Sequence, residues 1–186
     1  MVLDGLGNLL QEFDEQLEDF VATMESAFAK KSSIWIVGNG GSASTADHFE
    51  IDLLNVREVI SHPYTLRAHS MSSNNAVLTA VANDLDFDQV YSVQLKRKAI
   101  RGDICFLISA SGNSRNLVKA IEVCKDLGIL TLALVGFRGE NSLARLADKC
   151  IQIGLPLGSY AEAENLQLTI CHELSRRLKL ELYESF

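Results

Sequence analysis

Short apolar runs that alternate with longer helical stretches restrict the fold of this chain more than any other feature. The runs lie at 34–37, 65–69, 104–108, 130–135 and 150–153. The stretches between them have apolar residues at helical spacing, which predicts helices near 43–55, 74–82, 87–98, 115–126 and 141–147. Runs such as ICFLI are apolar on consecutive residues, which suits strands buried on both faces. The pattern predicts an α/β fold with three layers, in which helices cover both faces of a doubly wound, five-stranded parallel sheet in the flavodoxin-like order 2-1-3-4-5.

Long helices are predicted at the two ends of the chain, over 3–29 and roughly 161–182. The first has a wide apolar face with three- and four-residue spacing, formed by Leu9, Leu10, Phe13, Leu17, Phe20, Val21, Met24 and Phe28. Such a face is typical of a helix that bundles with copies of itself, so we expect a homo-oligomer. The chain has two prolines and no low-complexity linker, which predicts a single domain over 1–186. Within it, 1–30 is the oligomerisation helix and 31–186 the α/β core with its C-terminal helix.

The composition excludes two classes of function. The chain has 186 residues and a formal net charge of -7, and its 17 lysines and arginines are scattered, so we expect no nucleic acid partner. Apolar runs such as LTLALVG are far shorter than the roughly 20 residues of a membrane span, and the N-terminus is acidic where a signal peptide would be basic. We therefore expect a cytoplasmic protein without a membrane partner. The cysteines have no C-x-x-C spacing and lie in apolar segments, which predicts buried reduced thiols at Cys105, Cys124, Cys150 and Cys171.

Two loops rich in glycine and serine follow the first and third predicted strands. Their sequences are GNGGSAS at 38–44 and SASGNS at 109–114. In the 2-1-3-4-5 order these strands are neighbours, and ligands bind at the crevice beyond their carboxyl ends. Glycine lets a bulky anion approach the backbone, helix N-termini offer N–H groups, and serine hydroxyls add donors. Either loop alone could serve local structure, but the pair predicts a phosphate-binding site.

The same loops argue against a nucleotide cofactor. No Gly-Lys-Ser/Thr follows either of them, so neither is a P-loop. The GNGGSA stretch also lacks the G-x-G-x-x-G spacing of a dinucleotide-binding turn.

Four segments together resemble the sugar isomerase (SIS) domain family, and within it the phosphoheptose isomerases. These segments are GNGGSASTADHF, ISASGNSRNLVKAIEVCKDLGI, AVANDLDF and ENLQLTICHEL, and the resemblance covers essentially the whole chain. It implies an aldose–ketose isomerase that converts sedoheptulose 7-phosphate to glycero-manno-heptose 7-phosphate through an enediol, in heptose synthesis for lipopolysaccharide or capsule. It also implies a homotetramer with active sites between subunits, in which His172 of one chain faces His48 of another.

The resemblance also assigns residues to the substrate. Those implied to hold the phosphate and the sugar chain are Asn39, Gly40, Ser42, Asp84, Ser109, Ala110, Ser111, Ser114 and Glu164. Family members usually carry threonine at the position of Ala110, so one hydroxyl contact is missing here. The backbone N–H of Ala110 can still donate.

The predicted catalytic residues are Asp52 and His172. His48 and Asp52 stand four residues apart and therefore share one face of a helix. The resemblance makes Asp52 the proton-abstracting base, in place of the family's glutamate, and His172 its acid–base partner. It also implies a zinc site formed by His48, Asp52, Glu164 and His172, and two imidazoles with two carboxylates suit that metal.

Other interpretations of these residues stay open. Without the family, His172 could equally be a core or interface histidine, and Glu164 could simply belong to the acidic first turn of the last helix. The departures at Asp52, Ala110 and Glu164 favour a non-catalytic SIS protein, similar to the DnaA-binding regulator, or an isomerase of a related modified sugar phosphate. The retention of His48 and His172 favours the heptose isomerase.

Overall fold

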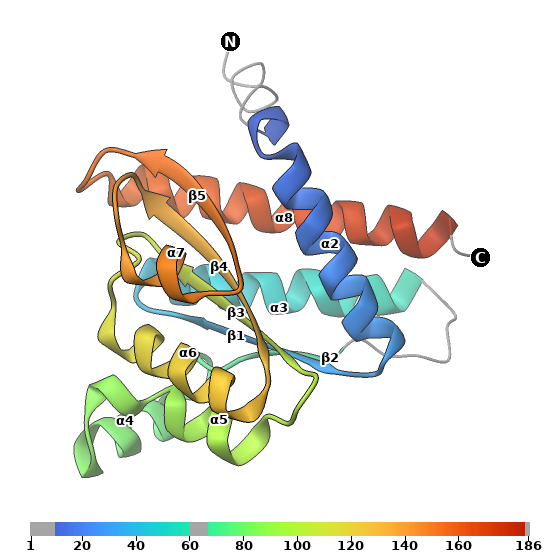
Figure 1. Ribbon diagram of the computed structural model, residues 1–186. Helices are drawn as coiled ribbons and strands as arrows, with labels where there is room; N and C mark the ends of the chain where they lie inside the picture. The colour runs from blue at the N-terminus through green and yellow to red at the C-terminus, as the bar shows by residue number, and fades with distance from the viewer. Residues whose placement is uncertain (1–9, 60–66, 185–186) are drawn as a thin grey trace.

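The sheet has the predicted architecture. The structure of the protein is a computed structural model that describes residues 10–59 and 67–184 (Figure 1). Five parallel strands pair in the order β2-β1-β3-β4-β5. Their bounds are β1 Ser33–Gly38, β2 Arg67–Ser70, β3 Ile104–Ser109, β4 Leu130–Phe137 and β5 Lys149–Leu155. Because β1 and β3 are neighbours, the loops that follow them meet at one edge of the sheet, as the sequence predicts.

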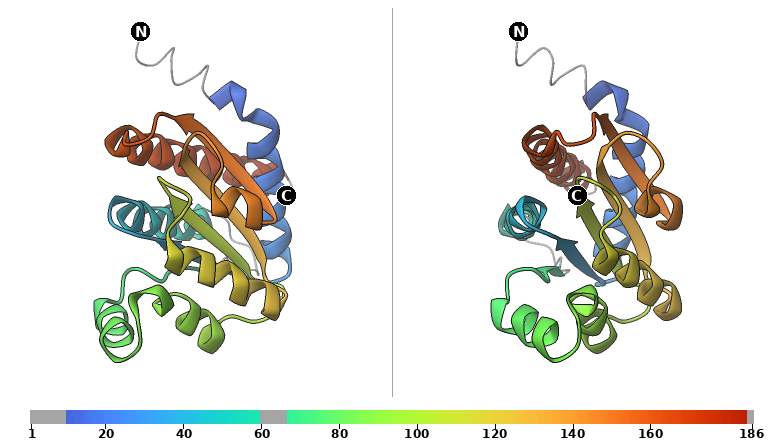
Figure 2. Two further views of the ribbon diagram at one scale, coloured as in Figure 1. Left: turned by 60° about the vertical axis from the view of Figure 1, so that its left-hand side comes forward. Right: turned by 90° about the vertical axis from the view of Figure 1, so that its left-hand side faces the viewer.

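Helices cover both faces of the sheet, which confirms the three-layer prediction (Figure 2). On one face lie α2 Asp14–Ala29, α3 Gly41–Val59 and α8 Tyr160–Glu184. On the other lie α4 Asn75–Asp84, α5 Ser92–Lys98, α6 Arg115–Leu127 and α7 Ser142–Leu146. Alternate residues of β1 supply the two cores: Ile34 and Ile36 face α2, α3 and α8, whereas Trp35 and Val37 face the opposite helices. This is why the strands are apolar on consecutive residues.

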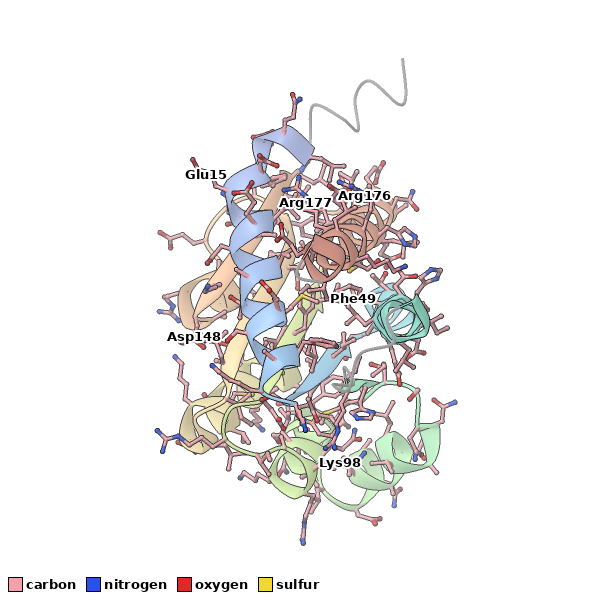
Figure 3. All side chains as sticks on the ribbon, turned by 90° about the vertical axis from the view of Figure 1, so that its right-hand side faces the viewer. Glu15, Phe49, Lys98, Asp148, Arg176 and Arg177 are labelled. Carbon is pink, nitrogen blue, oxygen red and sulfur yellow. The ribbon has the colours of Figure 1, made fainter. Side chains whose placement is uncertain are left out.

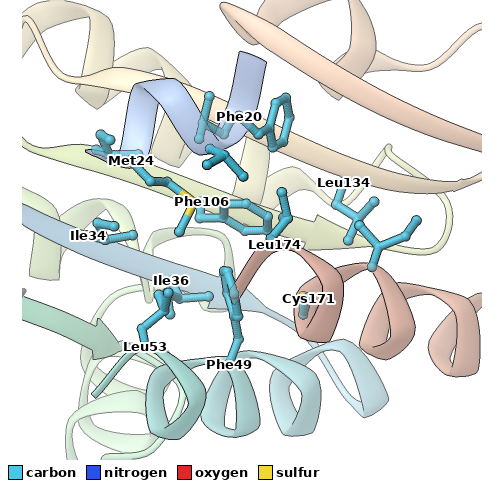
Figure 4. Close-up of a cluster of buried hydrophobic side chains, with 14 of the residues drawn as sticks. Phe20, Met24, Ile34, Ile36, Phe49, Leu53, Phe106, Leu134, Cys171 and Leu174 are labelled. Carbon is cyan, nitrogen blue, oxygen red and sulfur yellow. The ribbon is translucent and has the colours of Figure 1, made fainter. Parts of the chain in front are cut away.

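The core beneath α3 and α8 is built around Phe106 of β3 (Figure 4). Its ring lies 5.9 Å from that of Phe20 on α2, edge to face, and 5.0 Å from that of Phe49 on α3. Phe49 points from α3 toward the sheet (Figure 3). All three rings are buried, so this aromatic stack fixes α2 and α3 on the sheet.

The N-terminal helix differs from the prediction in its continuity and in what covers its apolar face, and residues 3–9 of the predicted helix lie outside the described residues. The structure describes it from residue 10, a turn at Phe13 interrupts it, and α2 runs over Asp14–Ala29. Its apolar residues, including Leu17, Phe20 and Met24, are buried in this chain's own core beneath α8 and the sheet. The expectation that this face bundles with other copies is therefore wrong for α2.

An ion-pair network fixes α2 to the C-terminal half of α8. The Arg177 guanidinium donates to Asp14 Oδ1 at 2.6 Å and to Glu173 Oε1 at 2.7 Å. Arg176 binds Glu173 through two further hydrogen bonds of 2.7 Å and, with Arg177, lowers the pKa of that carboxyl (Figure 3). The two helices at the ends of the chain are thus joined within one subunit.

The predicted helix over 87–98 is two separate elements. A 3₁₀ turn spans Phe87–Gln89 and α5 begins at Ser92. The Asp86 carboxylate accepts the Asp88 N–H at 2.7 Å, which fixes the first turn. Tyr91 is buried and its hydroxyl donates to the Gly38 carbonyl, so the chain must turn inward between the two elements. Burial raises the pKa of this hydroxyl, which therefore keeps its proton.

The cysteines are free thiols, as predicted. Cys105, Cys124 and Cys171 are buried, and Cys150 is half-buried. Burial raises the pKa of Cys150 to about 11, so it carries little thiolate at neutral pH. Among the described helices, none combines the length and apolar character needed to cross a bilayer.

The turn from β1 to α3 depends on a close backbone approach at Gly38. A Cβ atom at this position would lie 2.5 Å from the Ser42 carbonyl oxygen and 2.7 Å from its carbon, both backbone atoms. The Gly38→Ala variant is therefore expected to lower the free energy of unfolding by about 1–3 kcal/mol, as overpacked sites do. Urea denaturation followed by circular dichroism measures this change. An unchanged unfolding midpoint would show that the turn can relax.

Candidate active site

A cavity of about 170 Å³ lies where the loops after β1 and β3 meet. It is lined by Asn39, Ser42, Ile108, Ser109, Ala110, Ser111, Ser114, Tyr160 and Glu164. Most of the predicted substrate-binding residues are therefore brought together. Gly40 lies in the same loop with a φ of 56°, a left-handed conformation that favours glycine. Tyr160 was not predicted; its ring packs at 5.0 Å against Phe137, the last residue of β4.

Three serines in the loop after β3 differ in what their hydroxyls bind. Ser109 Oγ accepts the Gly112 N–H at 3.0 Å, and Ser111 Oγ accepts the Asn113 N–H at 3.2 Å. Ser114 is the N-cap of α6, but its side chain makes no capping hydrogen bond. The first two hydroxyls therefore brace the loop, while the Ser114 hydroxyl remains available to a ligand at the N-terminus of α6.

A reciprocal amide pair joins the two loops. Asn39 Nδ2 donates to Asn116 Oδ1, and Asn116 Nδ2 donates to Asn39 Oδ1, each at 2.9 Å. Asn116 is buried, and its Oδ1 also accepts the Leu117 N–H at 3.0 Å. Asn39 was predicted to contact the sugar, but its amide is already engaged. The sequence analysis did not predict Asn116 as a site residue. It could have been found as a polar residue on the first turn of the helix that follows the serine loop.

The Ser42 hydroxyl joins α3 to α8 instead of facing open space. It donates to Gln167 Oε1 at 3.1 Å, and Gln167 Nε2 donates to the Leu134 carbonyl at 3.3 Å. Ser42 and Gln167 are both buried. This polar bridge fixes the start of α3, and Gln167 was not among the predicted site residues.

Two other predicted contacts look different in the structure. Ala110 is buried in a small apolar cluster with Phe137 and Ala163, and its carbonyl accepts the Phe137 N–H at 2.9 Å. Asp84 ends α4 on an exposed surface, where its carboxylate accepts a hydrogen bond from Asn83 at 2.8 Å. It does not line the cavity, so the predicted hydroxyl contact of Asp84 is not made within this chain.

His48, Asp52 and His172 form a second group of polar side chains, which we call the His–Asp–His cluster. His172 Nδ1 lies 2.8 Å from Asp52 Oδ2, and His48 Nε2 lies 3.7 Å from Asp52 Oδ1. The two imidazole rings meet edge to face with centroids 4.9 Å apart. The Asp52 side chain is only 16% exposed, whereas both histidines are half-exposed. The cluster thus has a shielded carboxylate held between two accessible imidazoles.

The cluster has the chemistry of a zinc site. One ligand atom from each residue lies within 4.8 Å of the other two. Zinc bonds of about 2.0–2.1 Å would need these atoms slightly closer together, and three protein ligands leave a position for substrate or water. Glu164 does not belong to this group, so of the four predicted ligands the structure brings together three.

The cavity and the cluster are well separated within one chain. Helices α3 and α8 run parallel: Glu164 lies against Gly41 near their starts, and His172 lies against Asp52 further along (Figure 1). Eleven residues separate Gly41 from Asp52, which is roughly 16 Å of helix at 1.5 Å per residue. The expectation that His172 meets His48 across subunits is also corrected, because the two rings are in contact within one chain.

The comparisons with known proteins identify the class. The SIS domain family matches residues 2–136, which is most of the chain, and the fold and serine loop described above agree with this match. The protein belongs to the SIS domain family.

Its relatives within that family point to one kind of enzyme. A phosphoheptose isomerase of Colwellia psychrerythraea is 37% identical over 146 residues, which cover 78% of this chain and 74% of that one. A phosphoheptose isomerase of Helicobacter pylori is 32% identical over 171 residues, covering 92% and 86%. The solved phosphoheptose isomerase of Neisseria gonorrhoeae shares the fold, with a TM-score of 0.80 at 24% identity over 95% of this chain and 94% of that one.

The open hydroxyl of Ser114 gives a test of the phosphate site. The Ser114→Ala variant is expected to weaken sugar phosphate binding by about 1.5–3 kcal/mol, because a hydrogen bond to a charged group is lost. Isothermal titration calorimetry measures the change in Kd. The matched control is Ser44→Ala, which removes an exposed hydroxyl outside the cavity and should leave Kd unchanged. Equal affinities for both variants would contradict the assignment.

Proposed function

We propose that this protein is an aldose–ketose isomerase that converts sedoheptulose 7-phosphate to glycero-manno-heptose 7-phosphate. The names of its relatives support the reaction. The observation that carries the proposal is the His–Asp–His cluster, which supplies a carboxylate and imidazoles, the groups that enediol chemistry requires.

The isomerisation needs one proton to leave C1 and another to reach C2. The Asp52 carboxylate takes the proton from C1, the C–H electron pair forms the C1=C2 bond, and His172 gives a proton to the carbonyl oxygen on C2. His172 then takes the proton of the C1 hydroxyl as a new C1 carbonyl forms, and the electron pair of the C1=C2 bond takes the proton held by Asp52 at C2, which returns both residues to their starting states. The 2.8 Å contact between His172 Nδ1 and Asp52 Oδ2 supports these two roles.

We propose that His48, Asp52 and His172 hold one zinc ion. When bound, zinc would polarise the carbonyl and stabilise the negative oxygen of the enediolate. In its absence, the same residues provide the hydrogen-bonded acid–base frame described above.

The separation of cavity and cluster supports an active site built from two chains. With bonds near 1.5 Å, an extended seven-carbon sugar phosphate spans only about 10 Å. The two groups are roughly 12 Å apart along α8, from Glu164 to His172, and roughly 16 Å apart along α3, from Gly41 to Asp52. A second copy packed on α3 and α8 can bring its cluster over this chain's cavity. Beside the cluster, α3 exposes two apolar side chains that such packing would cover: Ile51 is 58% exposed and Leu54 39%.

The proposed assembly is a homotetramer of single SIS domains. Because the apolar face of α2 is buried within the chain, the proposed contacts between subunits involve the outward surfaces of α3 and α8.

The function is tested by incubating the protein with sedoheptulose 7-phosphate and a panel of ketose phosphates. Nuclear magnetic resonance follows the aldose product, with and without added zinc. Formation of an aldose heptose phosphate is the expected result. Binding of the ketose phosphates without turnover of any of them would instead support the non-catalytic SIS protein, which the departures at Asp52, Ala110 and Glu164 favour.

A further inference from the structure

Glu164 places a carboxylate in the cavity that is proposed to take a phosphate. A Cβ atom on Gly41 would lie 2.1 Å from the carboxyl carbon of Glu164 and 2.2 and 2.3 Å from its oxygens. The carboxylate therefore lies directly against the first residue of α3, where the helix dipole stabilises negative charge. It has no hydrogen bond or ion pair to any of the described residues, although it is half-buried. Its oxygens are open acceptors that face a binding cavity.

Among the described residues, the cavity lining offers no cation to offset this charge. Its described lining consists of amide, hydroxyl and apolar side chains besides Glu164, and none of them is basic. Arg115, at the start of α6, is exposed and paired with Asp88. A phosphate at the N-terminus of α6 would thus share a cavity of about 170 Å³ with the Glu164 carboxylate. Two negative charges within one such cavity repel each other strongly.

We propose that Glu164 is a specificity residue that makes the cavity reject free inorganic phosphate and accept phosphates attached to a polyhydroxylated chain. A bare phosphate is repelled by the carboxylate and brings few donors to compensate. A sugar phosphate carries several hydroxyl groups next to its phosphate, and each can donate to the open carboxylate oxygens. Hydrogen bonds to an ionised acceptor are stronger than neutral ones, so they offset the repulsion. The inference rests on the proposed function only in taking a sugar phosphate as the ligand.

The test compares two ligands on two variants by calorimetry. Glu164→Gln keeps the size of the side chain and removes its charge. Inorganic phosphate is expected to bind this variant about tenfold more tightly or better, because the repulsion is removed. The Kd of sedoheptulose 7-phosphate should fall by less than that of inorganic phosphate, or should rise. The reason is that the variant also loses a charged acceptor for hydrogen bonds from the sugar hydroxyls. The ratio of the two Kd values should therefore shift by about tenfold in favour of inorganic phosphate.

The control is Glu162→Gln, which removes the same charge from an exposed position on the first turn of α8. It should leave both Kd values unchanged. Equal tightening of both ligands in Glu164→Gln, or no change in either, would overturn the inference. The experiment measures binding, so failure of the Glu164 inference can be told from failure of the proposed function. If the wild-type protein binds sedoheptulose 7-phosphate without isomerising it, the isomerase proposal is contradicted and the role of Glu164 still stands.

Discussion

The His172→Gln variant is expected to lose turnover of sedoheptulose 7-phosphate by about 10²-fold or more, the lower bound for removal of a general acid–base group. His172 Nδ1 contacts Asp52 Oδ2, and glutamine keeps a polar side chain but cannot exchange a proton near neutral pH. Eight residues, or roughly 12 Å of helix, separate His172 from Glu164 in the cavity. Phosphate affinity should therefore stay nearly unchanged. The aldose product measures turnover, and calorimetry measures binding.

The matched control is His69→Gln. This histidine lies on β2 and stacks on Trp35 with ring centroids 4.9 Å apart, away from both the cavity and the cluster. Its replacement should leave turnover within about twofold, as a surface change away from the chemistry does. Equal losses in the two histidine variants, or a parallel loss of phosphate binding in His172→Gln, would mark His172 as a structural residue.

Two inactive variants are expected to restore activity when they assemble together. Asp52→Ala removes the proposed base, and Ser114→Asp places a carboxylate where the phosphate should bind. Aspartate is a favourable N-cap, so the second variant should fold. If each site joins one chain's cavity to its partner's cluster, a mixed pair of chains contains one fully native site. Random assembly of tetramers then makes about a quarter of all sites native, and about two-sevenths once only mixed tetramers are kept, whereas each variant alone has almost none.

The control for this experiment combines two variants that both damage the His–Asp–His cluster. Asp52→Ala mixed with His172→Gln leaves no native cluster in any assembly, so activity should not return. The chains are co-expressed with different affinity tags, and doubly tagged assemblies are isolated before turnover is measured. Mixed assemblies of Asp52→Ala and Ser114→Asp that remain inactive would show that cavity and cluster must come from one chain.

The sequence predicts the sheet well because its signal is local. Runs such as 104–108 are apolar at every position, and they have the length and the pattern of a strand covered on both faces. The break between the 3₁₀ turn and α5 is not local: it depends on the Tyr91 hydroxyl reaching Gly38, more than fifty positions earlier in the chain. The apolar face of α2 was equally ambiguous, since the spacing of its residues reveals that something covers them but not which surface does.

In the candidate site too, some features follow from local sequence spacing and others depend on how distant elements pack. The i, i+4 spacing of His48 and Asp52 fixes their shared helix face, and the contact with His172 follows the family resemblance. The hydrogen bonds that engage Asn39 and Ser42 depend on Asn116 and Gln167, which only the packing of separate elements brings near. The distance between cavity and cluster also required the structure, because it depends on α3 and α8 running in the same direction.

The reciprocal bonds between Asn39 and Asn116 have an evolutionary consequence. Each amide supplies one donor and one acceptor to the other, so a change at one position leaves two groups of its partner unpaired in a largely buried setting. Aspartate at either position would set an oxygen against an oxygen. We therefore expect the two positions to co-vary among homologues, with substitutions that occur together or not at all, although 77 positions separate them along the chain.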